Sequence, residues 1–374
     1  MTELISATVA DGVGHLTLDR PKALNALNFE MVVALTEVLD AWRDDSEVGV
    51  IVLDGEGDRG FCAGGDLREL HAFATGGDAL PAHDFFRAEY RLDAMIARYP
   101  KPIVAIMDGI TMGGGVGLSG HAAIRIVTER SRIAMPETRI GFTPDVGGTW
   151  LLANAPGELG VHLALNARTM DASDALHAGF ADAYVPSERL PHLLQALAER
   201  ADPGSPAEIV MLFDETPGPS ALALTRDWVD ACYSAPTVRE IIGRLRAFAR
   251  GDGATGRDAS LPRHPLDPGA PAYAAAAADE LETLSPTALT VTLESVRRAR
   301  TLPRLEDAFE QEFRAVTWFI EQHDLHEGIR AQVIDKDRNP RWNPPALDDV
   351  PPGLAARVLD EARFAPVWPA ASAG

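Results

Sequence analysis

The sequence predicts an α/β protein whose C-terminal part is helical, with residues 1–200 forming the α/β core and residues 201–374 the helical region. Strand-like and helix-like runs alternate through the first 200 residues, which is typical of α/β layering. From about Val185 onward the strand-like runs fade and helical periodicity takes over. With 374 residues, 46% of them hydrophobic, the chain has enough apolar material for a large core.

The strand-like runs of the core are short and rich in β-branched residues. They are GHLTLDR, VGVIVLDG, PIVAIMDG, IRIVTE and RIAMPE. Helical segments are predicted over residues 29–42, after Asp66 and after PIVAIMDG. Two units share one layout, because VIVLDG and IVAIMDG each run into a glycine turn (AGGD or MGGGVG) and then into a helix. This is a weak internal repeat of a strand, a turn and a helix.

The second half of the sequence predicts helices over residues 190–200, 238–250, 288–299 and 305–322. Residues 251–278 are dense in Gly, Pro, Ala and Asp, which breaks both periodicities and predicts an inserted surface loop. The tail beyond Pro344 ends in small residues and prolines, so we expect a frayed tip.

The charge balance limits the partners. The formal net charge is −21, from 34 Lys and Arg against 55 Asp and Glu, so the mean field repels nucleic acid and anionic lipid. No apolar run approaches the roughly 20 residues that span a bilayer. We therefore expect neither a nucleic acid nor a membrane partner, and any anionic ligand must meet a local cationic or backbone site.

Only two cysteines are present, Cys62 and Cys232, which provide neither a disulfide framework nor a metal-ligand cluster. The sequence therefore predicts no bound metal and a reducing compartment. The first residues, MTELISATVADGV, lack the features of a secretory or mitochondrial address, so we expect a cytoplasmic protein.

The stretch TMGGGVGLSG contains Gly115, Gly117 and Gly120 in the G-x-G-x-x-G spacing of a dinucleotide-binding turn. A dinucleotide site also needs an acid about 20 residues further on, at the end of the next strand. Glu129 ends IRIVTE only 14 residues after Gly115, which leaves little room for a crossover helix. A dinucleotide site is therefore disfavoured.

Such a turn can instead expose a backbone N–H at the start of a helix, where negative charge is stabilised. Glycines let a substrate carbonyl approach the backbone, and the second turn, in FCAGGDLREL, could supply another N–H beside it. Two such donors would form an oxyanion hole. The alternative is structural, namely that the glycines only permit tight turns and close packing.

The sequence resembles the crotonase (enoyl-CoA hydratase/isomerase) superfamily. The matching pieces are LDRPKALNAL, GFCAGGDLREL, KPIVAIMDGITMGGGVGLS, AMPETRIGFTPDVGG and HDLHEGIRAQVIDKDRNPRW. Within the superfamily, FFRAEY, MPET, PDVGG, HEGIRA and IDKDRNPRW resemble the branch of 3-hydroxyisobutyryl-CoA hydrolases. The likeness runs from about residue 14 to residue 342 as one family region.

The resemblance implies a spiral of ββα units that holds an acyl-CoA, with the thioester oxygen bonded by two backbone N–H groups. Carried onto this sequence, the donors are Gly65 and Gly114, and Asp66 caps the helix that follows. The implied coenzyme A contacts are Lys22, Ala23, Leu24 and Arg68. Coenzyme A enters with the substrate, so no separate cofactor is expected. Superfamily members are often trimers or hexamers, which implies a homo-oligomer, a trimer or a dimer.

The resemblance also bears on the reaction. A crotonase hydratase uses two glutamates, and one of them falls on Gly117, so half of its acid–base pair is missing and hydration is disfavoured. The other is Glu137, which would attack the thioester carbon or activate water. Eight residues on, Asp145 would orient water or protonate the leaving thiolate, and Glu89 would bond an acyl hydroxyl.

These residues favour hydrolysis of 3-hydroxyisobutyryl-CoA to 3-hydroxyisobutyrate and coenzyme A, a step of valine breakdown. One alternative is an enoyl-CoA hydratase or isomerase acting on short acyl-CoA. An alternative of another class is a non-catalytic acyl-CoA-binding subunit, which would need the backbone donors but not the acids. Cys62, His323 and His326 are interpreted as structural residues, since no catalytic or zinc-binding pattern surrounds them.

Overall fold

The computed structural model describes residues 4–76, 80–199, 206–252 and 269–368. Its larger sheet has six strands in the order β1-β2-β3-β5-β7-β9, with β1 antiparallel to β2 and the other pairs parallel. The bounds are β1 Ile5–Ala10, β2 Val13–Leu18, β3 Val50–Gly55, β5 Ile103–Met107, β7 Ile124–Val127 and β9 Ala183–Tyr184. A smaller parallel sheet has the order β4-β6-β8, from β4 Gly60–Cys62, β6 Ile110–Met112 and β8 Arg132–Ala134.

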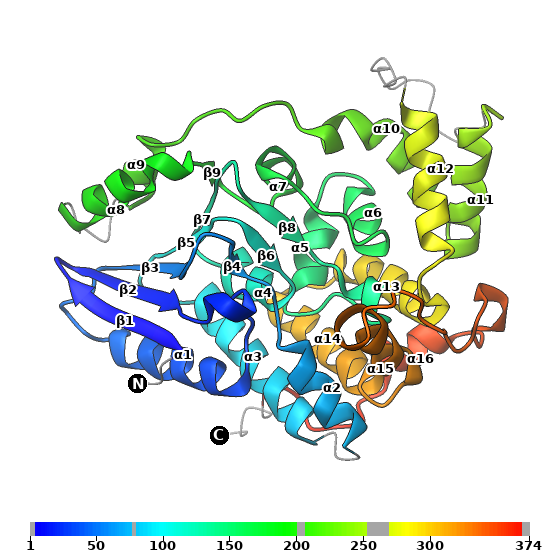
Figure 1. Ribbon diagram of the computed structural model, residues 1–374, viewed down its shortest axis with the longest axis horizontal. Coiled ribbons are helices and arrows are strands. Elements are labelled where there is room, and N and C mark those ends of the chain that lie inside the picture. The colour runs from blue at the N-terminus through cyan, green and yellow to red at the C-terminus, as the bar shows by residue number, and fades with distance from the viewer. Residues whose placement is uncertain (1–3, 77–79, 200–205, 253–268, 369–374) are drawn as a thin grey trace.

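The two sheets are built by one repeated unit (Figure 1). Each turn of the chain places one strand in the larger sheet, the next in the smaller sheet, and then a helix. The helices of the three turns are α2 (Leu67–Thr75), α4 (Gly114–Gly120) and the 3₁₀ helix η2 (Glu137–Ile140). This spiral of ββα units confirms the predicted fold class, and it contains a third unit that the sequence repeat did not reveal.

Helices cover both faces of the larger sheet, as parallel strands that are apolar on both sides require. The helices α1 (Phe29–Trp42) and α3 (Leu80–Ala97) pack on the face that forms the main core. On the other face, valines and isoleucines of β3, β5 and β7 meet α8 (Leu190–Glu199) and α9 (Pro206–Met211). In Figure 1, α8 and α9 lie apart from the remaining helices, beside this sheet.

Beyond Tyr184, every element of the described residues is a helix, as predicted. Three short helices lead into this region, α5 Gly148–Asn154, α6 Leu159–Leu165 and α7 Ala172–Ala178. The C-terminal helices are α10 Ala221–Tyr233, α11 Val238–Ala249, α12 Ala270–Leu281, α13 Pro286–Ala299, α14 Leu305–Phe319, α15 His323–Ile329 and α16 Leu354–Asp360. They lie against the last ββα unit and against α3, with α13 on α5 and α6 and α14 on α3.

The predicted loop over 251–278 is wrong in its second part. Residues 253–268 lie outside the described residues, but α12 already begins at Ala270. A run of alanines from Ala274 to Ala278 favours a helix more strongly than any other residue type does, and Pro271 stands in the first turn, where proline is tolerated. The glycines and prolines before this helix obscured it.

The C-terminal helical region contacts the ββα spiral through α15, which packs against η2. An ideal Cβ on Gly328 of α15 would collide with the carbonyl group of Ile140. Because overpacking costs about 1–3 kcal/mol, we expect Gly328→Ala to lower the free energy of unfolding by about that amount. Chemical denaturation measures this change.

Gly243 provides the matched control. It lies within α11 and an ideal Cβ there meets no atom within 4 Å. Gly243→Ala should raise the free energy of unfolding by about 0.5–1 kcal/mol, because alanine loses less backbone entropy in a helix. An equal response of the two variants would contradict the close contact between α15 and η2.

Within the described residues, no helix is both long and apolar enough to cross a membrane. Both cysteines are buried and free.

Candidate active site

Two glycine turns meet because β4 and β6 are neighbours in the smaller sheet. The turn after β4 contains Gly65, and the turn after β6 leads into Gly114, the first residue of α4. An ideal Cβ on Gly114 would lie 3.5 Å from the backbone nitrogen of Gly65, so the two amides are close together. Gly64 (φ +96°) and Gly113 (φ +48°) provide the left-handed conformations that the turns require.

Backbone hydrogen bonds with Leu27 hold the turn that contains Gly65. The Leu27 N–H donates to the Gly64 carbonyl at 2.8 Å, and the Asp66 N–H donates to the Leu27 carbonyl at 2.7 Å. Asp66 caps α2 as expected, since its Oδ1 accepts from the Arg68 N–H at 3.2 Å. In the described part of the chain, neither the Gly65 nor the Gly114 N–H has a protein acceptor. Both glycines line one space, in which their N–H groups have no protein partner among the described residues.

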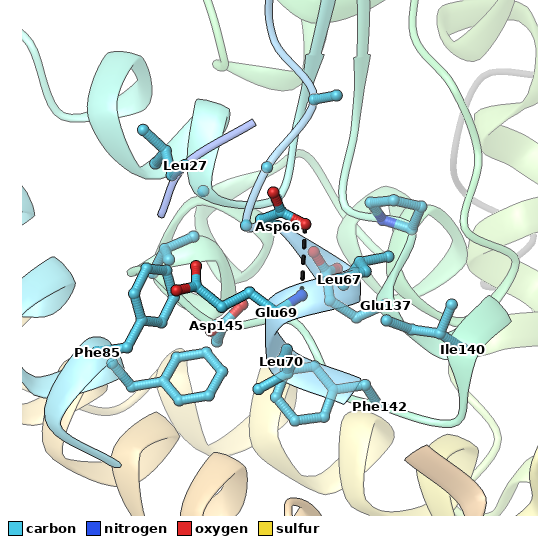
Figure 2. A pocket seen from close by; sticks show the side chains of 18 of the residues that line it. Leu27, Asp66, Leu67, Glu69, Leu70, Phe85, Glu137, Ile140, Phe142 and Asp145 are labelled. Carbon is cyan, nitrogen blue, oxygen red and sulfur yellow. Dashed lines mark hydrogen bonds between the residues drawn. The ribbon is translucent and has the colours of Figure 1, made fainter. Parts of the chain in front are cut away.

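That space is a cavity of about 230 Å³. Its walls are mainly apolar, and Figure 2 shows how Leu70, Phe85 and Phe142 surround it while Glu137 and Asp145 lie in the same pocket. Val333, from the π-helical turn η4 (Arg330–Ile334), also lines it. The pocket therefore combines the two backbone donors with carboxyl groups in an apolar surrounding, as binding sites for small molecules do.

Five carboxyl groups are buried around this pocket, and none is more than 6% exposed. They are Glu89, Asp93, Glu137, Asp145 and Glu312. Within the residues that the structure describes, none of the five pairs with Lys or Arg. A buried carboxylate without a cation is costly, so the cluster must hold protons at neutral pH.

Burial raises the pKa of Asp145 to about 7, against the opposing effect of a hydrogen bond from Tyr90. The Tyr90 hydroxyl donates to Asp145 Oδ2 at 2.9 Å. Burial raises the pKa of Glu137 well above its ordinary value, and the charge of Asp145 raises it further. Both acids therefore favour the protonated form more than a carboxyl group in water does.

Glu137 and Glu89 face the two turns. Glu137 Oε1 would lie 3.1 Å from an ideal Cβ on Gly113, so this carboxyl sits beside the second donor. An ideal Cβ on Gly114 would collide with Glu89 Oε1. Burial, together with the charges of Asp145 and Glu137, raises the pKa of Glu89 well above its ordinary value. Burial therefore favours the neutral form of the Glu89 carboxyl, and this form can donate a hydrogen bond.

There is no room for a side chain at Gly117. An ideal Cβ there would lie 2.7 Å from both Asp93 Oδ2 and Val146 Cβ, closer than real Cβ contacts come. Asp93 is fully buried, and neither of its carboxyl oxygens has a hydrogen-bond partner among the residues that the structure describes. The space beyond Gly117 thus belongs to a protein carboxyl and a valine, and no side chain fits at this position without displacing them.

The predicted coenzyme A contacts lie outside the cavity. Lys22 and Ala23 are in the 3₁₀ turn Pro21–Ala23, and Leu24 follows it. The Ala63 N–H donates to the Leu24 carbonyl at 3.0 Å, so this segment runs beside the first glycine turn. Arg68 is exposed on α2, and its Nη2 donates to the carbonyl of Val333. The role of these four residues stays a prediction.

Sequence reasoning missed three polar side chains of the site. Glu69 lines the pocket from α2, and burial, followed by the charge of Asp66, raises its pKa. Tyr90 binds Asp145, and Glu312 of α14 binds the turn after Asp145. Of these three residues, only Tyr90 could have been found from the sequence, because it directly follows Glu89 in the motif FFRAEY.

Cys62, His323 and His326, which the sequence analysis interprets as structural, all lie outside the residues that line the cavity. Cys62 is fully buried, and burial raises the pKa of its thiol to about 12, which leaves no reactive thiolate. A ring nitrogen of His323 lies 2.8 Å from the Arg341 carbonyl, and one of His326 lies 2.7 Å from the Ile320 carbonyl. No cluster of His, Cys, Asp and Glu with metal-binding geometry occurs within the described ranges.

The ββα spiral and its glycine-lined acyl pocket define the class of protein. The chain belongs to the enoyl-CoA hydratase/isomerase family, whose sequence profile matches residues 13–359. It is similar to the mitochondrial 3-hydroxyisobutyryl-CoA hydrolase of Gallus gallus, with 38% identity over 347 residues that cover 91% of this chain and 84% of that protein.

Two other relatives carry different names. The crystal structure of a carnitinyl-CoA dehydratase from Mycobacterium thermoresistibile has a TM-score of 0.86 and 42% identity, covering 97% of this chain and 98% of that one. The small ribosomal subunit protein mS47 of Neurospora crassa is 36% identical over 353 residues, which cover 90% of this chain and 67% of that protein. Because these names differ in activity, the geometry of the site has to distinguish them.

Proposed function

We propose that this protein hydrolyses the thioester of a short hydroxyacyl-CoA, with 3-hydroxyisobutyryl-CoA as the substrate, to the free acid and coenzyme A. The observation that carries this proposal is that two backbone N–H donors, which have no protein acceptor in the described residues, line the same pocket as Glu137 and Asp145. In addition, the neighbours of Gly117 leave no room for a further acidic side chain at that position. The similarity to the hydrolase of Gallus gallus supports the same substrate.

In the proposed reaction, the thioester oxygen accepts hydrogen bonds from the Gly65 and Gly114 N–H groups. These donors stabilise the negative charge that develops on this oxygen in the tetrahedral intermediate, an effect of about 2.7–4 kcal/mol per donor in a comparable hydrolase. Glu137 and Asp145 share one negative charge near neutral pH, and such a pair titrates as a unit.

The charge resides on Glu137 in the reactive state, because Glu137 lies beside the second donor. This carboxylate attacks the carbonyl carbon to give an acyl-enzyme anhydride that water then hydrolyses, or it takes a proton from water as the water attacks. In both routes the carbon–sulfur bond breaks and Asp145, protonated, gives its proton to the leaving thiolate. Glu89 bonds the acyl hydroxyl and so favours a hydroxyacyl group over a plain acyl chain.

The shared charge predicts the pH dependence. The pKa of Asp145 is raised to about 7 and that of Glu137 is also raised, so the pair loses its shared negative charge as the pH falls, and kcat should rise as the pH rises through about 7. The hydrogen bond from Tyr90 lowers the pKa of Asp145. Tyr90→Phe should therefore move this rise to higher pH, and pH–rate profiles of the two proteins measure the shift. A profile that does not move would contradict the coupling between Tyr90 and Asp145.

The name of the Mycobacterium thermoresistibile relative suggests reversible hydration as a second reaction. In the crotonase resemblance, that chemistry needs a glutamate where this chain has Gly117. Since Asp93 and Val146 occupy the space beyond Gly117, the second acid is both absent and sterically excluded. The site therefore favours hydrolysis.

The mS47 relative suggests a non-catalytic role in an assembly. A protein that only binds acyl-CoA needs the two backbone donors but gains nothing from buried acids that cost stability. Glu137 and Asp145 are both buried beside the donors, which favours an enzyme.

The finer predictions extend this proposal. The reaction would place the protein in valine breakdown, with no cofactor beyond the coenzyme A of the substrate. A homo-oligomer, a trimer or a dimer, is proposed from the superfamily resemblance. The relative from Gallus gallus is named as mitochondrial, and the cytoplasmic location of this chain stays a prediction from its sequence.

Thiol release from 3-hydroxyisobutyryl-CoA and from isobutyryl-CoA tests the function and the acyl group together. We expect stoichiometric coenzyme A and 3-hydroxyisobutyrate from the first substrate, and a lower kcat/KM for the second because Glu89 loses its partner. Equal rates would contradict the role of Glu89. Binding of both compounds without thiol release would favour the non-catalytic alternative.

A further inference from the structure

The turn that carries Asp145 has an unusual backbone. Residues 145–148 form a tight turn closed by a hydrogen bond of 2.6 Å from the Gly148 N–H to the Asp145 carbonyl. Both central residues, Val146 (φ +53°) and Gly147 (φ +74°), are left-handed, which is the pattern of a type I′ turn. A β-branched residue such as valine is a genuine outlier in this region. The turn is therefore strained and needs support from its surroundings.

Glu312 supplies this support from the C-terminal helical region. Its Oε2 accepts from the Gly147 N–H at 2.7 Å, and its Oε1 accepts from the Thr149 N–H at 2.9 Å and also from the Thr149 hydroxyl. Glu312 is fully buried in α14, and the hydrogen bond from the Gly147 N–H joins residues that are 165 positions apart in the sequence. One carboxyl group thus binds the amides that the strained turn leaves without partners.

His121 holds the same turn from another side. Burial lowers the pKa of His121 to about 4, so the ring is neutral at pH 7, and its Nε2 lies 3.0 Å from the Val146 carbonyl oxygen. An ideal Cβ on Gly147 would collide with this ring. Glu312 and His121 thus both contact the 145–149 turn through hydrogen-bonding groups, and the His121 ring leaves no room for a side chain at Gly147.

We propose that Glu312 is a positioning residue for the reaction, which acts by holding the 145–149 turn so that the Asp145 carboxyl faces Glu137 and the thioester. This inference rests on the proposed hydrolysis and extends it to the C-terminal helical region. Glu312 touches no part of the pocket, since Val146 and Asp145 are the residues of the turn that line it. Its effect on the reaction is transmitted through the backbone of the turn.

Glu312→Gln tests the proposal with little change of shape. The amide can no longer accept at both positions, and its NH₂ group would face a backbone N–H donor. A misplacement of about 1 Å at a reacting group can cost about 10²-fold, so we expect kcat to fall by about 10- to 100-fold with KM nearly unchanged. Thr149→Val, which removes only the hydroxyl donor, should cause a smaller loss of the same kind.

Gln311→Leu is the matched control. Gln311 is the adjacent buried residue of α14, and its side chain donates to the carbonyl and hydroxyl of Ser295, away from the turn. This variant should lose stability but keep kcat. If it lowers kcat as much as Glu312→Gln does, the effect of Glu312 is general loss of stability and the proposal is wrong.

A double mutant separates positioning from any independent role. If Glu312 acts through Asp145, adding Glu312→Gln to Asp145→Asn should lower the residual kcat by less than about twofold, because the group it orients is already lost. Multiplying losses would contradict the proposal.

Amide hydrogen exchange tests the positioning inference even if the wild-type protein hydrolyses no thioester, an outcome that would overturn the proposed function alone. The amides of Gly147 and Thr149 should be protected in the wild-type protein and in Gln311→Leu, and exchange much faster in Glu312→Gln. Unchanged protection in Glu312→Gln would show that the turn does not depend on this carboxyl group.

Discussion

Glu137→Gln should abolish thioester hydrolysis, with kcat falling by about 10²- to 10⁴-fold or more while the affinity for coenzyme A stays close to that of the wild-type protein. The amide has almost the same shape as the carboxyl but can neither attack the thioester carbon nor take a proton from water. Because Glu137 lies beside the second backbone donor and lines the acyl cavity, its loss removes the reacting group without changing the outer coenzyme A contacts. Single-turnover thiol release and equilibrium binding of coenzyme A separate these two effects.

Glu129→Gln is the control for this experiment. Glu129 is an exposed glutamate that accepts hydrogen bonds from Ser187 and lies outside the pocket, so kcat should not change. An equal loss of binding and turnover in Glu137→Gln would instead identify Glu137 as a structural residue.

Gly114→Ala should have an effect of similar size through a different mechanism. Its methyl group would collide with Glu89 Oε1 and lie 3.2 Å from Leu27 Cδ1, so the turn must shift and its N–H loses its direction. Removal of one oxyanion donor typically costs about 10²–10³ in kcat. Because the donor stabilises the tetrahedral intermediate more than the ground state, we expect the loss mainly in kcat rather than in KM.

Gly218→Ala offers a comparison, since an ideal Cβ on Gly218 meets no atom within 4 Å and the residue lies away from the pocket. It should leave kcat and KM unchanged. If Gly114→Ala also keeps its kcat, the Gly114 amide does not contribute to the reaction.

Most residues that line the pocket could be predicted from the sequence, but the residues that hold them in place, such as Glu312, could not. Gly65, Gly114, Glu89, Glu137 and Asp145 were all identifiable from short motifs, and the structure brings them to one pocket because β4 and β6 are neighbours. The interpretation of the dinucleotide spacing around Gly117 as accidental stays a prediction from the motif analysis. Glu312 is far from these motifs in the sequence and belongs to no motif of its own. It lies in α14, whose sequence shows only the periodicity of an amphipathic helix, so its contact with the turn could not be predicted.

The missed elements of the fold have physical reasons as well. The strands β4 and β6 contain three residues each, too few for a period of two to be recognised, and neither was predicted. The equally short β8 was predicted, because it lies within the strand-like run RIAMPE. The helix α12 was assigned to a loop because a segment dense in glycine and proline precedes its alanine run. The alanine run of α12 has a strong local preference that its neighbours obscured, whereas β4 and β6 depend on their pairing in the smaller sheet.

Because no acidic side chain fits at Gly117, a direct comparison of thioester hydrolysis with hydration tests the proposed function most directly. The protein is incubated in parallel with 3-hydroxyisobutyryl-CoA and crotonyl-CoA, and free thiol and the loss of the enoyl absorbance are followed in each. The account predicts thiol release from 3-hydroxyisobutyryl-CoA, with a kcat/KM that exceeds that of crotonyl-CoA hydration by about 10²-fold or more, since half of the acid–base pair for hydration is missing. Rapid hydration of crotonyl-CoA without thiol release from either substrate would contradict it.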